Sequence, residues 1–351
     1  MTHELRYVLS DFDYELPPEL IAQTPIEERS ASRLLVARRS SAPAGRGAFE
    51  DLIFSDLLNL IPAGDLLVLN TSRVRHARLI GMRPSGEPAE VLLIRPADDG
   101  SWLALGKPGS ALQPGKRIEL EQGAWVETVE VLADGNRRVR ILGATAEDVM
   151  SRSGRVPLPP YIAREPRPAD ELRYQTVYAK REGSVAAPTA GLHFTNELLD
   201  ALSARGVVIA GLDLEVGPGT FKPVEIEPLE QHRMHAERYD IPERLAALTG
   251  EVRRLGGRIW AVGTTVVRAL ESAADADGAV RPGPGETSLL ILPGFRFKVV
   301  ERLITNFHLP RSTLLMLVSA FAGHDTVLAA YEHAIQKRYR FYSYGDAMVV
   351  I

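Results

Sequence analysis

The stretch TNELLDALSARGVVIAGLDLEV, residues 195–216, predicts a helix followed directly by a strand. Thr195 suits the N-cap position, because its hydroxyl can accept a hydrogen bond from a backbone N–H of the first turn. Three leucines follow at helical spacing and form one apolar stripe: Leu198, Leu199 and Leu202. Gly206 predicts the end of the helix, and the apolar run 207–216 predicts a strand. A helix that leads into a strand in this way is typical of α/β proteins.

The same alternation recurs twice more along the chain. RIWAVG, residues 258–263, leads into an apolar-striped helix that begins near Thr264. VERLIT, residues 300–305, leads through a polar turn into a helix capped by Ser312. We therefore expect a largely parallel sheet with three turns at the carboxyl ends of its strands, where open α/β sheets bind their ligands.

The three turns carry small and polar residues that suit a ligand site. Small residues allow the backbone to approach a flat ligand, and an imidazole can transfer a proton or donate a hydrogen bond. A histidine in such a turn can also serve only to shape it. The residues that we expect at the site are Thr189, Gly191, His193, Thr264, Thr265, Asn306 and His308.

Two further motifs lie between these units. VGPGTFKPV, residues 216–224, is a turn with Gly217 and Gly219, which fits either a bend or a ligand cradle. A strand from Met234 to Ile241 would place His235 and Glu237 on one face, as an acid/base pair or as a surface cluster. The spacing matches no standard metal-ligand pattern, so we expect no metal.

Residues 73–150 have a different texture. Six short alternating runs, separated by turns rich in Gly, Pro, Asp and Asn, predict a small antiparallel barrel or sandwich. The expected architecture is a larger α/β domain, residues 1–72 and 154–351, with an inserted antiparallel β-barrel domain, residues 73–153.

The composition limits the classes of protein to which the chain can belong. A length of 351 residues with 45% hydrophobic residues supports a substantial core. The absence of cysteine excludes disulfides and thiolate chemistry and fits a reducing cytoplasm. No apolar segment is long enough for a signal peptide or a membrane span, so we expect a cytoplasmic protein without a membrane partner. The net charge of −4 argues against a protein that coats nucleic acid.

Several common catalytic signatures are missing from the sequence. It contains no GxGxxG after a strand, no GxxxxGK[ST], no GxSxG and no HExxH. The dinucleotide-binding, P-loop, α/β-hydrolase and zinc-protease interpretations therefore lack their motifs.

Eight blocks, in this order, resemble a known family. They are DFDYELPPELIAQTPIEERSASRLLV, RYQTVYA, GSVAAPTAGLHFT, VGPGTFKPV, HRMHAERY, AVGTTVVRALES, TNFHLPRSTLLMLVSAFAG and YRFYSYGDAM. The family is the S-adenosylmethionine:tRNA ribosyltransferase-isomerases of queuosine biosynthesis, and the resemblance covers nearly the whole chain. It also implies a larger α/β domain with a small inserted β-barrel.

The resemblance implies an uncommon reaction. S-adenosylmethionine donates its ribosyl part to the aminomethyl group of a 7-deazaguanine at the wobble position of a tRNA with a GUN anticodon. The ribose is rearranged to an epoxycyclopentane, which gives epoxyqueuosine and releases adenine and methionine. S-adenosylmethionine is a substrate here, and no cofactor is implied.

This chemistry needs a base to remove a proton next to the sulfonium and an acid near the departing adenine. The candidate catalytic residues in the matched blocks are His193, His235, Glu237 and His308. We expect His193 or His235 to transfer the proton, with Glu237 orienting it. The residues expected to bind substrate are Thr189, Gly191, Glu215, Gly217, Gly219, Thr264, Thr265 and Asn306.

The implied tRNA partner gives a role to the arginines that flank the barrel. Arg73, Arg75, Arg78 and Arg155 are candidate phosphate contacts. At two positions the chain departs from the family pattern. Ser72 separates Thr71 from Arg73, and Glu215 stands where the family has histidine.

Two alternatives remain open on the sequence. The acceptor could be a free deazaguanine or another small amine, which Glu215 favours and the arginines oppose. The chain could also be a non-catalytic RNA-binding protein, which would have no need of the site blocks. We expect the protein to act as a monomer.

Overall fold

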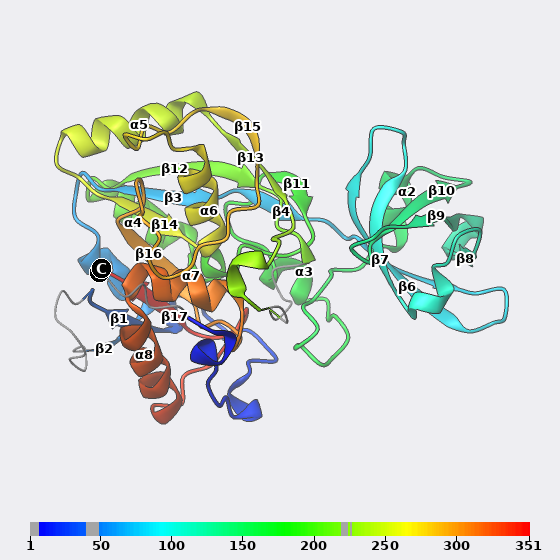
Figure 1. Ribbon diagram of the computed structural model, residues 1–351, viewed down its shortest axis with the longest axis horizontal. Helices are drawn as coiled ribbons and strands as arrows, with labels where there is room; N and C mark the ends of the chain where they lie inside the picture. Colours follow the sequence, from blue (N-terminus) through cyan, green and yellow to red (C-terminus); the bar gives the residue numbers. More distant parts are fainter. Residues whose placement is uncertain (1–6, 40–48, 219–223, 225–226) are drawn as a thin grey trace.

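The computed structural model describes residues 7–39, 49–218, 224 and 227–351 of the chain. A larger α/β domain lies beside a smaller β-barrel, to which the chain passes and from which it returns (Figure 1). The predicted fold class, an α/β domain with an inserted antiparallel barrel, is confirmed.

Nine of the described strands form the main sheet of the α/β domain. In spatial order they are β15 (Gly283–Thr287), β13 (Glu237–Ile241), β12 (Val208–Leu214), β3 (Leu66–Asn70), β14 (Ile259–Val262), β16 (Arg302–Asn306), β17 (Ala347–Val350), β1 (Arg33–Ala37) and β2 (Glu50–Ile53). Among the described strands, β12, β3, β14 and β16 form a parallel block of four, and β17 and β1 form a separate parallel pair. β17 runs antiparallel to β16, and both edges carry antiparallel strands. The sheet is therefore mixed rather than largely parallel.

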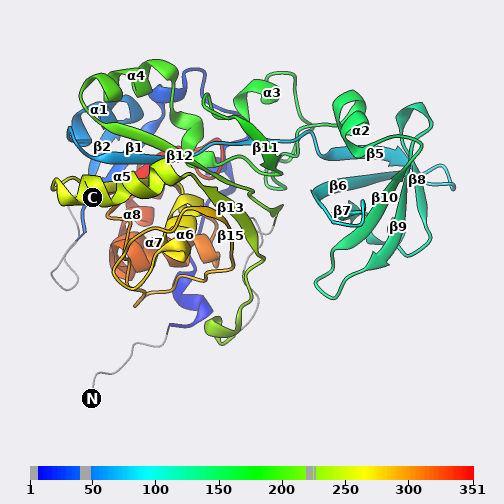
Figure 2. The same cartoon turned by 90° about the horizontal axis from the view of Figure 1, so that it is seen from above.

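Helices cover both faces of this sheet, as Figure 2 shows. α1 (Leu57–Leu60) and α4 (Asn196–Ala204) pack on one face, against alternate residues of β1, β3 and β14. The opposite face is covered by α5 (Glu243–Arg254), α6 (Thr264–Ala273), α7 (Thr313–Ala322) and α8 (His324–Gln336). Alternate side chains of a strand point to opposite faces, so the central strands are apolar on both sides.

Six strands close into the barrel, and each corresponds to one of the six alternating runs in the sequence. They are β5 (Arg78–Met82), β6 (Pro88–Pro96), β7 (Trp102–Lys107), β8 (Arg117–Glu119), β9 (Trp125–Val131) and β10 (Arg137–Leu142). Inward-facing residues such as Leu79, Val91 and Val139 fill the interior.

Two short strands and two short helices join the domains. β4 (Ser72–Val74) leads into the barrel and pairs in parallel with β11 (Arg181–Ser184), which lies on the returning chain. The return path also includes α2 (Ala146–Ser153) and α3 (Asp170–Arg173). Asn70 fastens this entry, because its Nδ2 donates to the Leu214 carbonyl and its Oδ1 accepts from the Leu214 and Ser72 amides.

The first of the three predicted strand-turn-helix units differs from expectation. The segment before its turn is not a strand of the main sheet, because β11 pairs only with β4. The turn itself is a short 3-10 helix, Thr189–His193, which leads into α4. Thr195 caps α4 as predicted, since its hydroxyl accepts from the Leu198 amide.

No single described helix is both long and apolar enough to cross a membrane. In the part of the chain that the structure describes, one pair, α7 and α8, reaches that length and composition when taken together, with a bend of 113° between the two helices.

The position of α6 depends on a buried carboxylate. Glu271 accepts hydrogen bonds from the backbone amides of Lys298, Val299 and Val300, at 2.8, 3.0 and 2.8 Å. These hydrogen bonds join α6 to the segment that leads into β16. Thr264 at the start of α6 and Asn306 at the end of β16 belong to two of the three expected turns.

We expect Glu271→Ala to lower the free energy of unfolding by about 3 kcal/mol, because it leaves buried amides without acceptors. Urea denaturation measures the loss. Glu251→Ala, on the exposed face of α5, is the matched control and should change stability by less than about 0.5 kcal/mol. Equal losses in the two variants would contradict this role of Glu271.

Candidate functional site

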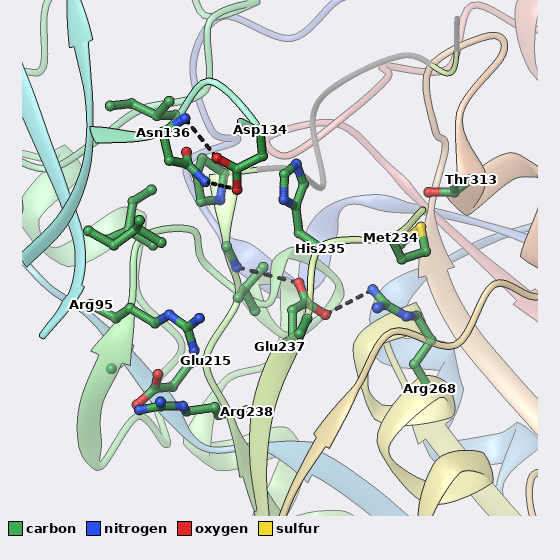
Figure 3. A pocket seen from close by; sticks show the side chains of 18 of the residues that line it. Arg95, Asp134, Asn136, Glu215, Met234, His235, Glu237, Arg238, Arg268 and Thr313 are labelled. Atoms are coloured by element: carbon green, nitrogen blue, oxygen red, sulfur yellow. Dashed lines mark hydrogen bonds and ion pairs between the residues drawn. The ribbon is translucent and has the colours of Figure 1, made fainter. Parts of the chain in front are cut away.

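A cavity of about 230 Å³ lies between the barrel and the α/β domain, and we call it the interdomain cavity (Figure 3). The barrel contributes Arg95, Asp134 and Asn136 to its wall. The α/β domain contributes residues 215–218, the segment around β13, and one residue each from α6 and α7. Clefts between domains are preferred places for ligand sites.

A buried ion pair forms part of the floor of this cavity. Glu237, at the start of β13, accepts a hydrogen bond of 2.8 Å from Nη1 of Arg268 on α6. Only 5% and 3% of the two side chains are exposed. Glu237 also accepts from the Gly217 amide at 3.4 Å. Charges removed from water in this way must be paired, so the two residues hold β13 against α6.

Two histidines precede β13 and line the same cavity. The strand begins at Glu237 rather than at Met234, so His235 lies outside it, on an exposed segment. The predicted start of the strand at Met234 is therefore wrong, but His235 and Glu237 both line the interdomain cavity. His232 is partly buried, and its Nδ1 is buried with no hydrogen-bond partner among the described residues. Burial, followed by the nearby His235, lowers the pKa of His232.

The three expected turns meet at a second, smaller cavity of about 40 Å³, which we call the turn cavity. Its lining includes Thr189, Thr264, Thr265, Asn306 and His308. Gly263 turns the chain into α6 with a φ of 92°, a conformation that favours glycine. Val216 lines both cavities, so they are neighbours.

His193 does not belong to the lining of either cavity as the described residues define them. Its Nε2 lies 3.0 Å from Nδ2 of Asn306, and its Nδ1 lies 2.7 Å from Oγ of Ser32. The Asn306 amide can only donate here, so Nε2 accepts and Nδ1–H donates. Burial, together with Arg29 and Arg340, lowers the pKa of His193 to about 3. The neutral ring, stacked on Phe54, therefore positions Asn306.

Asn306 in turn presents an unpartnered acceptor. Its Nδ2 also lies 3.3 Å and 3.4 Å from the carbonyls of Tyr342 and Asp346, which fixes the orientation of the amide. Its Oδ1 is buried and has no hydrogen-bond partner in the described part of the chain. His308, beside it, is held through Nε2 by Thr305 at 2.7 Å, and burial lowers its pKa to about 3.

The glycines and the acid of the predicted site have different surroundings. A Cβ at Gly191 would lie 2.1 Å from the Tyr178 hydroxyl, so packing within the protein explains this glycine. Glu215 and Gly217 line the interdomain cavity. Gly219 lies outside the described residues.

The four predicted phosphate-binding arginines are not equivalent. Arg78 forms ion pairs with Glu90 at 2.9 Å and Glu165 at 3.0 Å, which compensate its charge. Arg155 lies 3.8 Å from Glu165 and is half exposed. Arg75 lies over the Trp102 ring at 5.6 Å and donates to the Glu182 carbonyl. Arg73 is partly buried on β4.

Sequence reasoning did not single out His232, Arg268 or Thr313, nor the barrel residues of the interdomain cavity. One signal was present for Arg268, because it is the only charged residue in the first two turns of α6. No comparable pattern marks Asp134 or Asn136, which reach the cavity only because the barrel folds against the α/β domain. Among the described residues, no group of three metal-ligating side chains is present.

Comparison with known proteins places these features in a family context. The family model described as "Queuosine biosynthesis protein" matches residues 9–350. A protein of Symbiobacterium thermophilum named S-adenosylmethionine:tRNA ribosyltransferase-isomerase is 53% identical over 346 residues, which are 98% of this chain and 99% of that protein. A protein of the same name from Azoarcus sp. is 51% identical, with 97% of each chain covered.

One solved structure is also similar. The crystal structure of S-adenosylmethionine tRNA ribosyltransferase from Thermotoga maritima is 37% identical to this chain, with a TM-score of 0.56. The match covers 97% of this chain and all of the other.

The two buried neutral histidines predict a pH dependence of stability. Because their folded pKa values are lowered to about 3, their contribution is full above the unfolded value near 6.5 and is lost as the pH falls toward 3. The free energy of unfolding of the unaltered protein should therefore fall between pH 7 and pH 5.5. In His308→Gln we expect this fall to be smaller by about 1 kcal/mol. Urea denaturation at the two pH values tests this, and an unchanged decline would contradict it.

Proposed function

The chain belongs to the queuosine biosynthesis protein family, and on that premise we propose its reaction. It transfers and isomerises the ribosyl part of S-adenosylmethionine onto 7-aminomethyl-7-deazaguanine at the wobble position of tRNA with a GUN anticodon. The products are epoxyqueuosine-tRNA, adenine and methionine. The observation that carries the proposal is the interdomain cavity, whose wall combines two histidines, the buried Glu237–Arg268 pair and polar residues of the barrel.

The histidines of the interdomain cavity supply the proton transfers in this proposal. The carbon next to a sulfonium is acidified, so a base at neutral pH can remove its proton. His232 suits this step because burial lowers its pKa, which favours the basic form of the ring, and because its Nδ1 has no partner in the described structure. His235, exposed beside it, can return a proton to the departing adenine.

The turn cavity suits the neutral groups of the donor. Oδ1 of Asn306 can only accept, so it fits a ribose hydroxyl or an amino group rather than a carboxylate. The backbone amides at the start of α6, at Thr264 and Thr265, are the complementary donors. In this arrangement His193 acts by holding Asn306 in place.

The tRNA would lie across the junction of the barrel and the α/β domain, where Arg73 and Arg155 are available to phosphates. The sulfonium activates the donor, so the proposed reaction needs neither a metal nor a redox cofactor. Action in the cytoplasm and as a monomer stays a prediction. The alternative of a non-catalytic RNA-binding protein is set aside, because the full-length relatives bear the names of enzymes.

Adenine release tests the proposed reaction. With S-adenosylmethionine we expect adenine only when tRNA carrying the deazaguanine precursor is present. Release with the free deazaguanine would favour the small-acceptor alternative, and no release with either would contradict the proposal. His232→Gln should lower the rate by about 100-fold or more, as expected for loss of a general base. His333→Gln, on α8 and outside both cavities, is the control and should leave the rate nearly unchanged.

Salt dependence tests the tRNA contacts. We expect the double variant Arg73→Gln/Arg155→Gln to bind tRNA more weakly, with a log–log salt slope reduced by roughly 0.7–0.9 for each lost phosphate contact. Arg254→Gln is the control, because α5 lies on the far side of the α/β domain from the barrel (Figure 1). If the double variant and the control both keep the salt slope of the unaltered protein, Arg73 and Arg155 do not contact the tRNA.

A further inference from the structure

Arg268 has more hydrogen-bond donors than the described residues satisfy. The residue is on α6 with only 3% of its side chain exposed, and Nη1 donates to Glu237. Its Nε and Nη2 are buried and have no hydrogen-bond partner among the described residues. Buried polar groups are nearly always paired, because desolvation without a partner is costly. Two such donors on one buried guanidinium, unpaired within the described part of the chain, therefore indicate a ligand-binding position.

The two free donors have the geometry of a carboxylate receptor. The N–H groups of a guanidinium form a rigid planar fork, and Nε–H and one Nη–H point in parallel from the same edge. Such an edge binds both oxygens of one carboxylate with two parallel hydrogen bonds. Glu237 occupies Nη1 and leaves the Nε and Nη2 donors available.

The surroundings favour a ligand that carries both charges. Arg268 lines the interdomain cavity together with Glu237 and with Thr313, the first residue of α7 (Figure 3). The Glu237 carboxylate, 2.8 Å from the guanidinium, would repel a phosphate, which carries negative charge alone. The pair of Arg268 and Glu237 instead complements a zwitterion, in which an ammonium group lies beside a carboxylate. The deep burial of Arg268 also keeps it from a tRNA backbone that lies on the surface.

We propose that Arg268 binds the carboxylate of the methionine part of S-adenosylmethionine through Nε and Nη2, with Glu237 beside the α-ammonium group. This inference rests on the proposed function, since it assumes the sulfonium donor. The amino-acid end of the donor then lies on the floor of the interdomain cavity. Its nucleoside end extends past Val216, which lines both cavities, toward the acceptor atom of Asn306.

A comparison of two ligands tests the subsite without altering the protein. S-adenosylmethionine and its decarboxylated analogue, which lacks only the carboxylate, are titrated calorimetrically into the full chain. The titrations are made both with and without tRNA that has an unmodified guanine at the wobble position, so that no turnover occurs. We expect the analogue to bind about 30- to 100-fold more weakly, the loss of two charge-assisted hydrogen bonds. Equal affinities, or no binding of the donor under either condition, would overturn the proposal.

Two variants assign the discrimination to Arg268. Arg268→Lys keeps a positive charge beside Glu237 but removes the planar pair of donors. It should weaken S-adenosylmethionine binding while leaving the analogue nearly unaffected, so that the two affinities come within about threefold. Arg254→Lys, exposed on α5, should leave the ratio as it is in the unaltered protein. If Arg268→Lys does not fold, the two-ligand comparison on the unaltered protein still decides whether the carboxylate is recognised.

The outcomes separate this subsite from the proposed reaction. If Arg268→Lys weakens tRNA binding and reduces its salt slope but preserves the ratio of the two ligands, the guanidinium binds a phosphate and the proposal is wrong. If carboxylate discrimination depends on Arg268 but no acceptor supports adenine release, the subsite stands and the proposed reaction falls.

Discussion

The pairing of Glu237 with Arg268 is the constraint on which the site depends. A carboxylate and a guanidinium that are both withdrawn from water lose several kcal/mol of hydration each, and only their close contact offsets that loss. The pair therefore fixes the start of β13 against α6, two elements that are 31 positions apart at these residues. The same contact places the histidines before β13 and Arg268 of α6 around one cavity, while the N-terminus of α6 lines the neighbouring turn cavity. The protein keeps an ion pair here that an apolar contact could replace for stability alone, which fits a role in binding.

A second buried network acts on the neighbouring cavity and works without charge. Ser32, His193 and Asn306 form a chain of hydrogen bonds in which each partner has only one compatible role. Burial keeps the imidazole neutral, so its Nε2 remains an acceptor and the amide of Asn306 cannot rotate. As a result, Oδ1 of Asn306, at the end of β16, is an acceptor atom at a defined position. Preorganised polar atoms of this kind hold a ligand without reorganising when it binds.

The inserted barrel completes the site. β13 and the segment before it form one side of the interdomain cavity. Arg95, Asp134 and Asn136 of the barrel close the other side of the interdomain cavity. The entry and return of the chain are fastened by the Asn70 hydrogen bonds and by the pairing of β4 with β11. The domain insertion thus supplies one wall of the interdomain cavity.

The amino-acid sequence by itself determined the local structure: six barrel strands, the capped helices, and the strands before α6 and α7. These follow from side-chain periodicity and capping, which act over a few residues. The parallel and antiparallel order of the main sheet, the start of β13 and the structural surroundings of His193 came only with the tertiary structure. They depend on contacts between residues far apart in the chain. The same holds for the burial that lowers the pKa of His193, and for the burial of the Arg268 donors that have no partner among the described residues. Spacing along a chain can place a histidine at the end of a strand, but whether that ring meets a ligand or a neighbouring amide is decided by what packs around it.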